Sequence, residues 1–200
     1  ETIAWSPRAD ALAYTTLEGG RVALLSEGSF FDLPVPELAH LLWSPDGRYL
    51  AVEQEGVGTW RIFRREASEF SLVSIIVESL SATWLSLTEM VFAPPEGGLV
   101  LMDMAAGNQQ TTLLDPFQEY HLLQRRSDGS LFVLGGAPGS ASGQLLQLQF
   151  SAAGINVIEL GSAEIEVRGT RWAPGGDLLF AFQGGVLALI NPFTGDGLTL

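Results

Sequence analysis

The sequence predicts an all-β protein made of five repeats of four strands each, and three observations carry this prediction. The 23 glycines and 10 prolines of the 200-residue chain are dispersed singly, which favours many short strands joined by turns over a few long helices. One motif recurs along the chain at nearly constant spacing. After each copy of the motif, apolar residues occupy alternate positions, as they do in a strand that buries one face.

The recurring motif is clearest at Trp43-Ser-Pro-Asp-Gly, which lies between two apolar stretches. Four other residues hold the same place in matching stretches and, with Trp43, serve as anchors of the repeat: Trp5, Trp84, Gln124 and Trp172. Successive anchors are separated by 38, 41, 40 and 48 residues. The residues seven and nine positions after each anchor are all apolar: Leu12, Tyr14, Leu50, Val52, Val91, Ala93, Leu131, Val133, Leu179 and Ala181. We therefore expect these positions to share one face of the strand that follows each anchor.

Each repeat divides into four strands in the same order. In the second repeat we expect strands over 39–43, 48–54, 59–63 and 70–77, with the charged segment 64–69 as the last turn. Four strands in a unit of about forty residues are typical of one blade of a β-propeller, in which radial repetition leaves only short, protected sheet edges. The sequence thus predicts a single β-propeller domain of four-stranded blades, with repeat units at approximately 1–36, 37–77, 78–117, 118–163 and 164–200.

The stretch Trp43-Ser-Pro-Asp-Gly-Arg-Tyr-Leu-Ala-Val resembles the WD40-like repeat of TolB-type propellers. The other copies depart from it in places, since the third lacks the proline and the fourth lacks the tryptophan. The resemblance implies that the indoles pack between blades and that Pro-Asp-Gly forms a turn, so that the motif residues are structural. It also implies a non-catalytic interaction module in an extracytoplasmic compartment, either the periplasm or the cell surface.

The number of blades in the complete ring is a separate question. The chain starts on a first strand and finishes on a fourth strand, so neither end supplies a strand to complete the blade at the other. We expect five blades that close end to end through side-chain packing. The alternative is a partial ring of a larger propeller, whose other blades lie outside these residues.

The charge of the chain excludes two classes of partner. All ten basic residues are arginines, and with 23 acidic residues they give a net charge of −13, which repels nucleic acid and anionic lipid. No apolar run reaches the roughly 18 residues that a membrane span requires. A protein partner, cationic or polar, fits this charge better. Because the first residue is Glu1 rather than methionine, we expect an N-terminal segment to have been removed.

Sequence motifs of catalysis are missing. There is no Gly-x-Ser-x-Gly, no P-loop and no Gly-x-Gly-x-x-Gly after a strand, and the absence of cysteine excludes thiolate metal sites and cysteine nucleophiles. His40 and His121 each lie three residues before an anchor, but their repeats are not adjacent and there is no third histidine for a metal site. We expect both to be polar residues of first strands, and we predict no catalytic residue, metal or cofactor.

Candidate binding residues form one acidic constellation. In four repeats a glutamate precedes the anchor by five or six residues: Glu37, Glu78, Glu119 and Glu166. Entries to the first strands of a propeller gather at one mouth of its channel, so these carboxylates are expected to ring that mouth; the alternative is that they are merely solvated. The segment 135–143 lengthens the fourth repeat and reads as a flexible loop over the same mouth, with Gly135, Gly136, Ser140 and Ser142 as contact residues.

Two functions remain open at the level of sequence. The first is a non-catalytic scaffold or binding module that offers a channel mouth or a blade edge to a protein or small ligand. The second is a hydrolase of the glycosidase type, in which two carboxylates roughly 5 to 10 Å apart line the channel. Glycosidase sites add aromatic platforms, and only Trp60 lies outside the repeat anchors, so the first function is the better supported.

Overall fold

The computed structural model of the chain consists of strands and turns. It describes residues 2–16, 19–25, 27–35, 38–54, 56–67, 69–114, 118–126, 128–151, 154–160, 165–173, 178–183, 186–192 and 197–199. Within these ranges it contains twenty strands and no helix, so none of the described elements is a helix that could cross a membrane.

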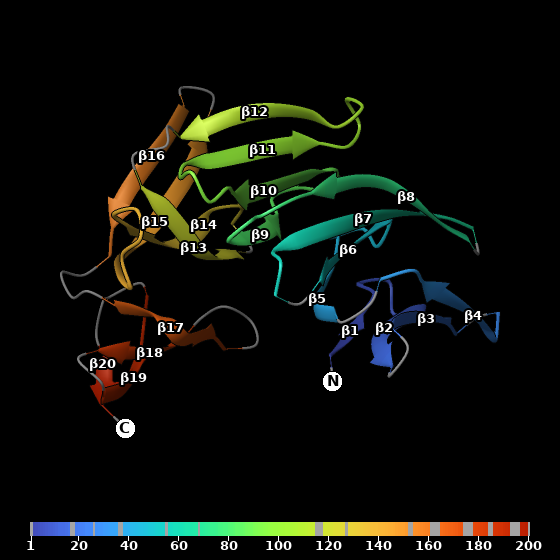
Figure 1. Cartoon of the computed structure of the whole chain (residues 1–200), viewed down its shortest axis with the longest axis horizontal. Coiled ribbons are helices and arrows are strands. Elements are labelled where there is room, and N and C mark those ends of the chain that lie inside the picture. Colours follow the sequence, from blue (N-terminus) through green and yellow to red (C-terminus); the bar gives the residue numbers. More distant parts are fainter. Residues whose placement is uncertain are drawn as a thin grey trace. The chain divides into compact units, whose positions relative to one another are not determined.

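Three four-stranded sheets follow one another along the first part of the chain, each with its strands in sequence order (Figure 1). The first contains β1 (Ile3–Trp5), β2 (Ala11–Thr16), β3 (Gly19–Leu24) and β4 (Ser29–Leu33). The second contains β5 (Leu38–Trp43), β6 (Tyr49–Gln54), β7 (Thr59–Glu66) and β8 (Glu69–Ile76). The third contains β9 (Ser81–Trp84), β10 (Glu89–Ala93), β11 (Leu99–Asp103) and β12 (Gln109–Leu114). The prediction of an all-β chain in four-stranded units is confirmed.

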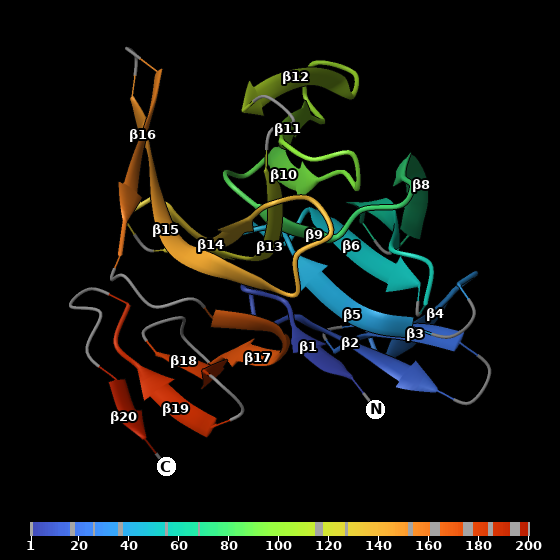
Figure 2. The same ribbon diagram turned by 60° about the vertical axis from the view of Figure 1, so that its left-hand side comes forward.

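The last eight strands form two further sets of four, which share a strand. The fourth set contains β13 (Glu119–Arg125), β14 (Leu131–Gly136), β15 (Ser142–Ser151) and β16 (Gly154–Glu159). The fifth contains β17 (Ile165–Trp172), β18 (Leu179–Gln183), β19 (Val186–Ile190) and β20 (Gly197–Thr199). The long strand β15, conspicuous in Figure 2, pairs with β14 and β16 and, at its first two residues, with β17. The fourth and fifth sheets are thereby joined, which the repeat pattern does not predict.

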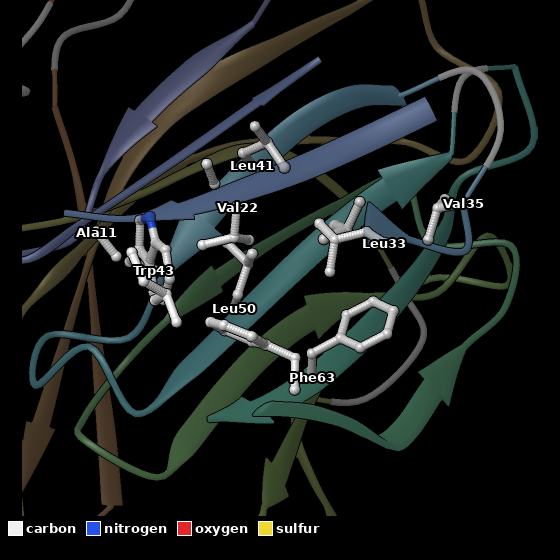
Figure 3. Close-up of a cluster of buried hydrophobic side chains, with 12 residues drawn as sticks. Ala11, Val22, Leu33, Val35, Leu41, Trp43, Leu50 and Phe63 are labelled. Carbon is white, nitrogen blue, oxygen red and sulfur yellow. The ribbon is translucent and has the colours of Figure 1, made fainter. Parts of the chain in front are cut away.

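The described chain forms two compact units. The first comprises Glu1–Ser79, Ser86–Met90 and Asp103–Gln109, and the second comprises Leu80–Leu85, Val91–Met102 and Gln110–Leu200. In the first unit a core lies between the first two sheets, where Val22 meets Trp43, Leu50 and Phe63 (Figure 3). Trp43 is 9% exposed, and its ring packs edge-on against Phe70 with the ring centres 6.0 Å apart.

Anchor side chains hydrogen-bond to the first strand of the preceding sheet or to the residue that follows it. The indole N–H of Trp43 donates to the carbonyl of Ala4 at 3.0 Å, and that of Trp172 donates to the carbonyl of Leu122 at 2.6 Å. In the fourth sheet, where the sequence has no tryptophan, Nε of Arg125 donates to the carbonyl of Leu85 at 2.7 Å. Each bond satisfies a backbone acceptor at a sheet-to-sheet junction within one of the two units.

The repeat register needs correction in two places. Trp5, Trp43 and Trp172 each pair with the residue seven positions later, but in the fourth sheet it is Arg125, not Gln124, that pairs with Leu131. A bulge between His121 and Gln124, with Leu122 at φ 54, absorbs the extra residue.

The third repeat is displaced as well. Its Val91 and Ala93 pack with Leu123, Leu131 and Val133 of the fourth sheet, so they lie on the face opposite to the one predicted. The turn after Trp84 is shorter than the Trp-Ser-Pro-Asp-Gly turn, and a shorter turn moves the next strand into another register.

One expectation about tryptophan is wrong. Trp5 is 58% exposed, although the resemblance implies a packed anchor. Trp60, which lies outside the repeat anchors, is 3% exposed. The segment 64–69 is also not a long turn, since β7 continues to Glu66 and β8 begins at Glu69. Charged pairs on exposed ladder positions, such as Arg64 with Glu66, are compatible with a strand.

Candidate functional site

The first strand of the fourth sheet positions a carboxylate and an imidazole side by side. Tyr120 and Leu123 of β13 point into the core and are each 6% exposed. Because side chains alternate along a strand, Glu119 and His121 lie together on the other face. Nε2 of His121 is 3.6 Å from Oε2 of Glu119, and the two side chains are 17% and 16% exposed.

The connection between β14 and β15 is a tight hairpin rather than the flexible loop predicted over 135–143. Gly135 and Gly136 belong to β14, and Ser142 begins β15, so only 137–141 connect the strands. The amide of Ser140 donates to the carbonyl of Ala137 at 2.9 Å, with Pro138 and Gly139 between them. Proline followed by a glycine at φ 74 is the pattern of a type II turn.

Glu119 ties this turn to β13. The amide of Gly139 donates to Oε1 of Glu119 at 3.0 Å, so one carboxylate oxygen holds the turn while the other faces His121. The turn residues Ala137, Pro138 and Gly139 are exposed. Glu119 therefore fixes an exposed turn at the ends of β14 and β15. We call this arrangement the hairpin site, and it consists of Glu119, His121, the turn 137–141, Ser142 and Glu166.

Glu166 lies next to the hairpin because β17 pairs with the start of β15. Ser142 is the register partner of Glu166, and the amide of Val167 donates to the carbonyl of Ala141 at 2.9 Å. Glu119 pairs with Gly136 on the other side of the hairpin. Glu119 and Glu166 thus lie on β13 and β17, with β14 and β15 between them. Three strand spacings put the backbones of the two residues about 14 Å apart. They flank the hairpin from both sides.

Glycines allow β14 and β15 to approach each other closely. A Cβ on Gly143 would lie 2.8 Å from the carbonyl oxygen of Gly135, and a Cβ on Gly136 would lie 2.7 Å from that of Ser142. Real Cβ atoms do not approach backbone this closely, so only glycine lets β14 and β15 meet at this point. The glycines that the sequence marks as loop residues are therefore packing residues of the hairpin site.

Burial sets the protonation of the hairpin site. Burial lowers the pKa of His121 below its ordinary value, and the carboxylate of Glu119 opposes this shift without cancelling it. Burial also raises the pKa of the neighbouring Tyr120. At neutral pH the imidazole of His121 is therefore uncharged.

The structure brings together some of the residues that the sequence singles out. Glu119, Glu166, Ser140 and Ser142 lie at one hairpin of the second unit. Glu78 is exposed at a bend after β8 in the first unit, with φ 54, and Glu37 lies outside the described residues.

His40, the repeat-related counterpart of His121, lies in the first unit. Its Nδ1 contacts Oε2 of Glu53, so each histidine has a carboxylate neighbour. His121 is the site residue that sequence reasoning left out. Its spacing of two residues from Glu119 on a strand was the available signal.

Comparison with solved structures settles the fold. Over 98% of this chain and 56% of the other, it is similar to an auxiliary nutrient binding protein from Bacteroides thetaiotaomicron, with 10% identity and a TM-score of 0.63. Over 94% of this chain and 63% of the other, it is similar to the Cps50 (Swd1) β-propeller domain of Myceliophteria thermophila, with 15% identity and a TM-score of 0.61. The chain is a β-propeller. Its four-stranded sheets are blades, and the hairpin site lies where the fourth blade joins the fifth.

A further structural relative is a chain of the mitotic checkpoint complex, matched over 98% of this chain and 64% of the other, with 21% identity and a TM-score of 0.61. This chain spans less than two thirds of the length of each of these three structures. No family model and no curated protein matches the sequence. The likeness to these three structures is thus one of fold.

Proposed function

We propose that the chain is a non-catalytic binding module and that the hairpin site is its recognition surface. The observation that carries this proposal is the bond from the Gly139 amide to Glu119, which fixes an exposed turn beside a carboxylate at the junction of two blades. Rigid turns at the end of a β-scaffold are common places for binding, because the ordering cost is met before the partner arrives.

The partner proposed is a polar or cationic segment of a protein. Support comes from the net charge of −13 and from the two glutamates that flank the exposed turn. Such a charge arrangement raises association rates more than it raises final affinity. For the glycosidase alternative, Trp60 offers no aromatic platform, because it is buried.

The finer assignment of the repeat is also a proposal. The sequence around Trp43 supports a WD40-like repeat of the TolB type, and with it a place outside the cytoplasm, in the periplasm or at the cell surface. The similarity to the Bacteroides nutrient binding protein supports this place.

The test uses a peptide selected from a random peptide library on the immobilised chain. Its association rate is then measured against salt for the wild type and for a Glu119→Gln, Glu166→Gln double variant. We expect the double variant to lose roughly tenfold in association rate at low salt and to show a flatter salt dependence.

A matched control removes the same charge elsewhere. Glu96 lies in the turn before β11 and Glu159 ends β16, and both are exposed. The Glu96→Gln, Glu159→Gln double variant should keep the wild-type rate within about twofold. Equal losses in the two double variants would mean that the peptide responds to net charge alone and would remove the hairpin site as the recognition surface.

A further inference from the structure

Each blade of the chain has two apolar faces, and successive residues of its second strand point alternately to one face and to the other. The front face carries the anchor, its register partner and the residues two positions away; in the second blade these are Leu41, Trp43, Leu50 and Val52, all buried. The back face carries the residues between them; in the first blade these are Ala11 and Ala13, both 0% exposed.

Junctions within the units pair a back face with a front face. In the first unit, Ala11, Ala13 and Val22 of the first blade pack against the front face of the second, and the indole of Trp43 bonds to Ala4. In the second unit, Phe132 of the fourth blade stacks on Trp172 of the fifth, with the ring centres 5.5 Å apart. Each unit, considered by itself, therefore joins its blades through an anchor indole and apolar back-face residues.

Within the described part of the first unit, nothing covers the front face of the first blade in this way. Ile3 is 65% exposed and Trp5 is 58% exposed. The row that begins at Trp5 continues through Leu12 and Ala23 to Phe30, which is 66% exposed. In the second blade the counterparts of Ile3 and Trp5 are Leu41 and Trp43, which are only 6% and 9% exposed. The counterpart of Phe30 is Leu72, which is 48% exposed, so the two blades differ at their first strands. Ile3 and Trp5 thus form an uncovered apolar docking surface.

Within the described part of the second unit, the back face of the fifth blade is uncovered too. Leu178 and Phe180 are 36% and 39% exposed, whereas Ala11, Ala13 and Ala51 at equivalent places are fully buried. Across the sheet, Phe180 pairs with Leu189, which pairs with Leu198, and Leu198 is 64% exposed.

We propose that these two faces are blade-docking surfaces, and that in the native protein both are covered by further four-stranded blades of the same repeat, outside residues 1–200. We infer the occupant from the junctions within the units. At each of them, one blade contributes an anchor indole that donates to a carbonyl of its neighbour, and the neighbour contributes small or aromatic back-face residues. The similar propellers agree, because this chain covers only 56% to 64% of their lengths, which leaves room for roughly two to four more blades of about forty residues.

The absence of cysteine makes a direct test possible, since one introduced cysteine is a unique reporter. Trp5→Cys reports on the front face and Phe180→Cys on the back face. Ala51→Cys is the buried control, at 0% exposure, and Leu72→Cys on β8 is the exposed control, at 48%. Maleimide labelling rates are measured in the 200-residue chain and in the longer natural chain with its flanking sequence.

In the 200-residue chain, shown to be monomeric by sedimentation, both reporters should label as fast as Leu72→Cys. In the longer chain both should slow at least about tenfold, towards Ala51→Cys. Slow labelling in the 200-residue monomer would mean that the two faces cover each other, and slow labelling only in a dimer would make a second copy the occupant. Fast labelling in the longer chain, or a natural chain without further blades, would also overturn the proposal.

Discussion

Replacing Trp43 by alanine removes the side chain that joins the first and second blades. The indole is 9% exposed, packs edge-on against Phe70 and donates to the carbonyl of Ala4. Deleting a buried aromatic side chain costs about 3 to 5 kcal/mol, which includes the lost burial and the cavity that remains. The melting temperature should therefore fall by roughly 6 to 20 °C, at 2 to 4 °C per kcal/mol for a chain of this size.

A second substitution separates the hydrogen bond from the packing. Trp43→Phe keeps an aromatic ring but removes the hydrogen bond to the carbonyl of Ala4, and a hydrogen bond of this kind contributes about 0.5 to 1.5 kcal/mol. Trp5→Ala is the matched control, since the same anchor in the first blade is 58% exposed and surface substitutions of this kind change stability by about 1 kcal/mol or less.

Scanning calorimetry with far-UV circular dichroism measures all three variants of the 200-residue chain. The expected order of destabilisation is Trp43→Ala, then Trp43→Phe, then Trp5→Ala. Equal losses for Trp43→Ala and Trp5→Ala would refute the reasoning, because the two anchors differ in burial and not in their place in the repeat.

Three other substitutions address the hairpin site and the first unit. Gly143→Ala should destabilise the chain by about 1 to 3 kcal/mol in urea unfolding, because its Cβ would meet the Gly135 carbonyl at 2.8 Å. The lowered pKa of His121 means that the unfolded chain takes up the proton first, so stability should fall as pH falls from 6.5 towards the folded pKa, and His121→Asn should remove this slope. Burial raises the pKa of Asp10, but the hydrogen bonds and charge of Arg65, at 3.0 Å from both carboxylate oxygens, outweigh it and lower the pKa below 3.8. Stability from this pair should be present above pH 3.8 and be lost as pH falls through the folded pKa, and Asp10→Asn should flatten that part of an acid titration followed by circular dichroism.

The strands were predictable from the sequence because apolar residues recur at every second position within each of them. The four strands predicted around Trp43 all exist, and the alternation of Leu50 and Val52 does bury one face. The register was predictable only where the turn after the anchor has its full length. At Val91 the shorter turn shifts the strand, and apolar residues on both faces of β10 hide the shift in the sequence.

Apart from His121, the residues of the hairpin site were predictable from the sequence, but the form of the site was not. Glu119, Glu166 and Ser142 could be named from repeat spacing. A run of glycine and serine reads equally as a loop or as closely packed strands, and only Pro138-Gly139 indicated a defined turn. The pairing of Ser142 with Glu166 depends on contact between two repeats, which the period within one repeat does not encode.

The most direct test of the binding surface is a ¹H–¹⁵N correlation titration of the wild-type chain with the selected peptide. Binding at the hairpin site predicts that the amides of Gly139, Ser140 and Ser142 shift, and that the Gly139 amide, bonded to Glu119, shifts among the most. The turn at Asp46 and Gly47 should stay unchanged. Shifts concentrated at that turn, with the hairpin amides unmoved, would contradict the account.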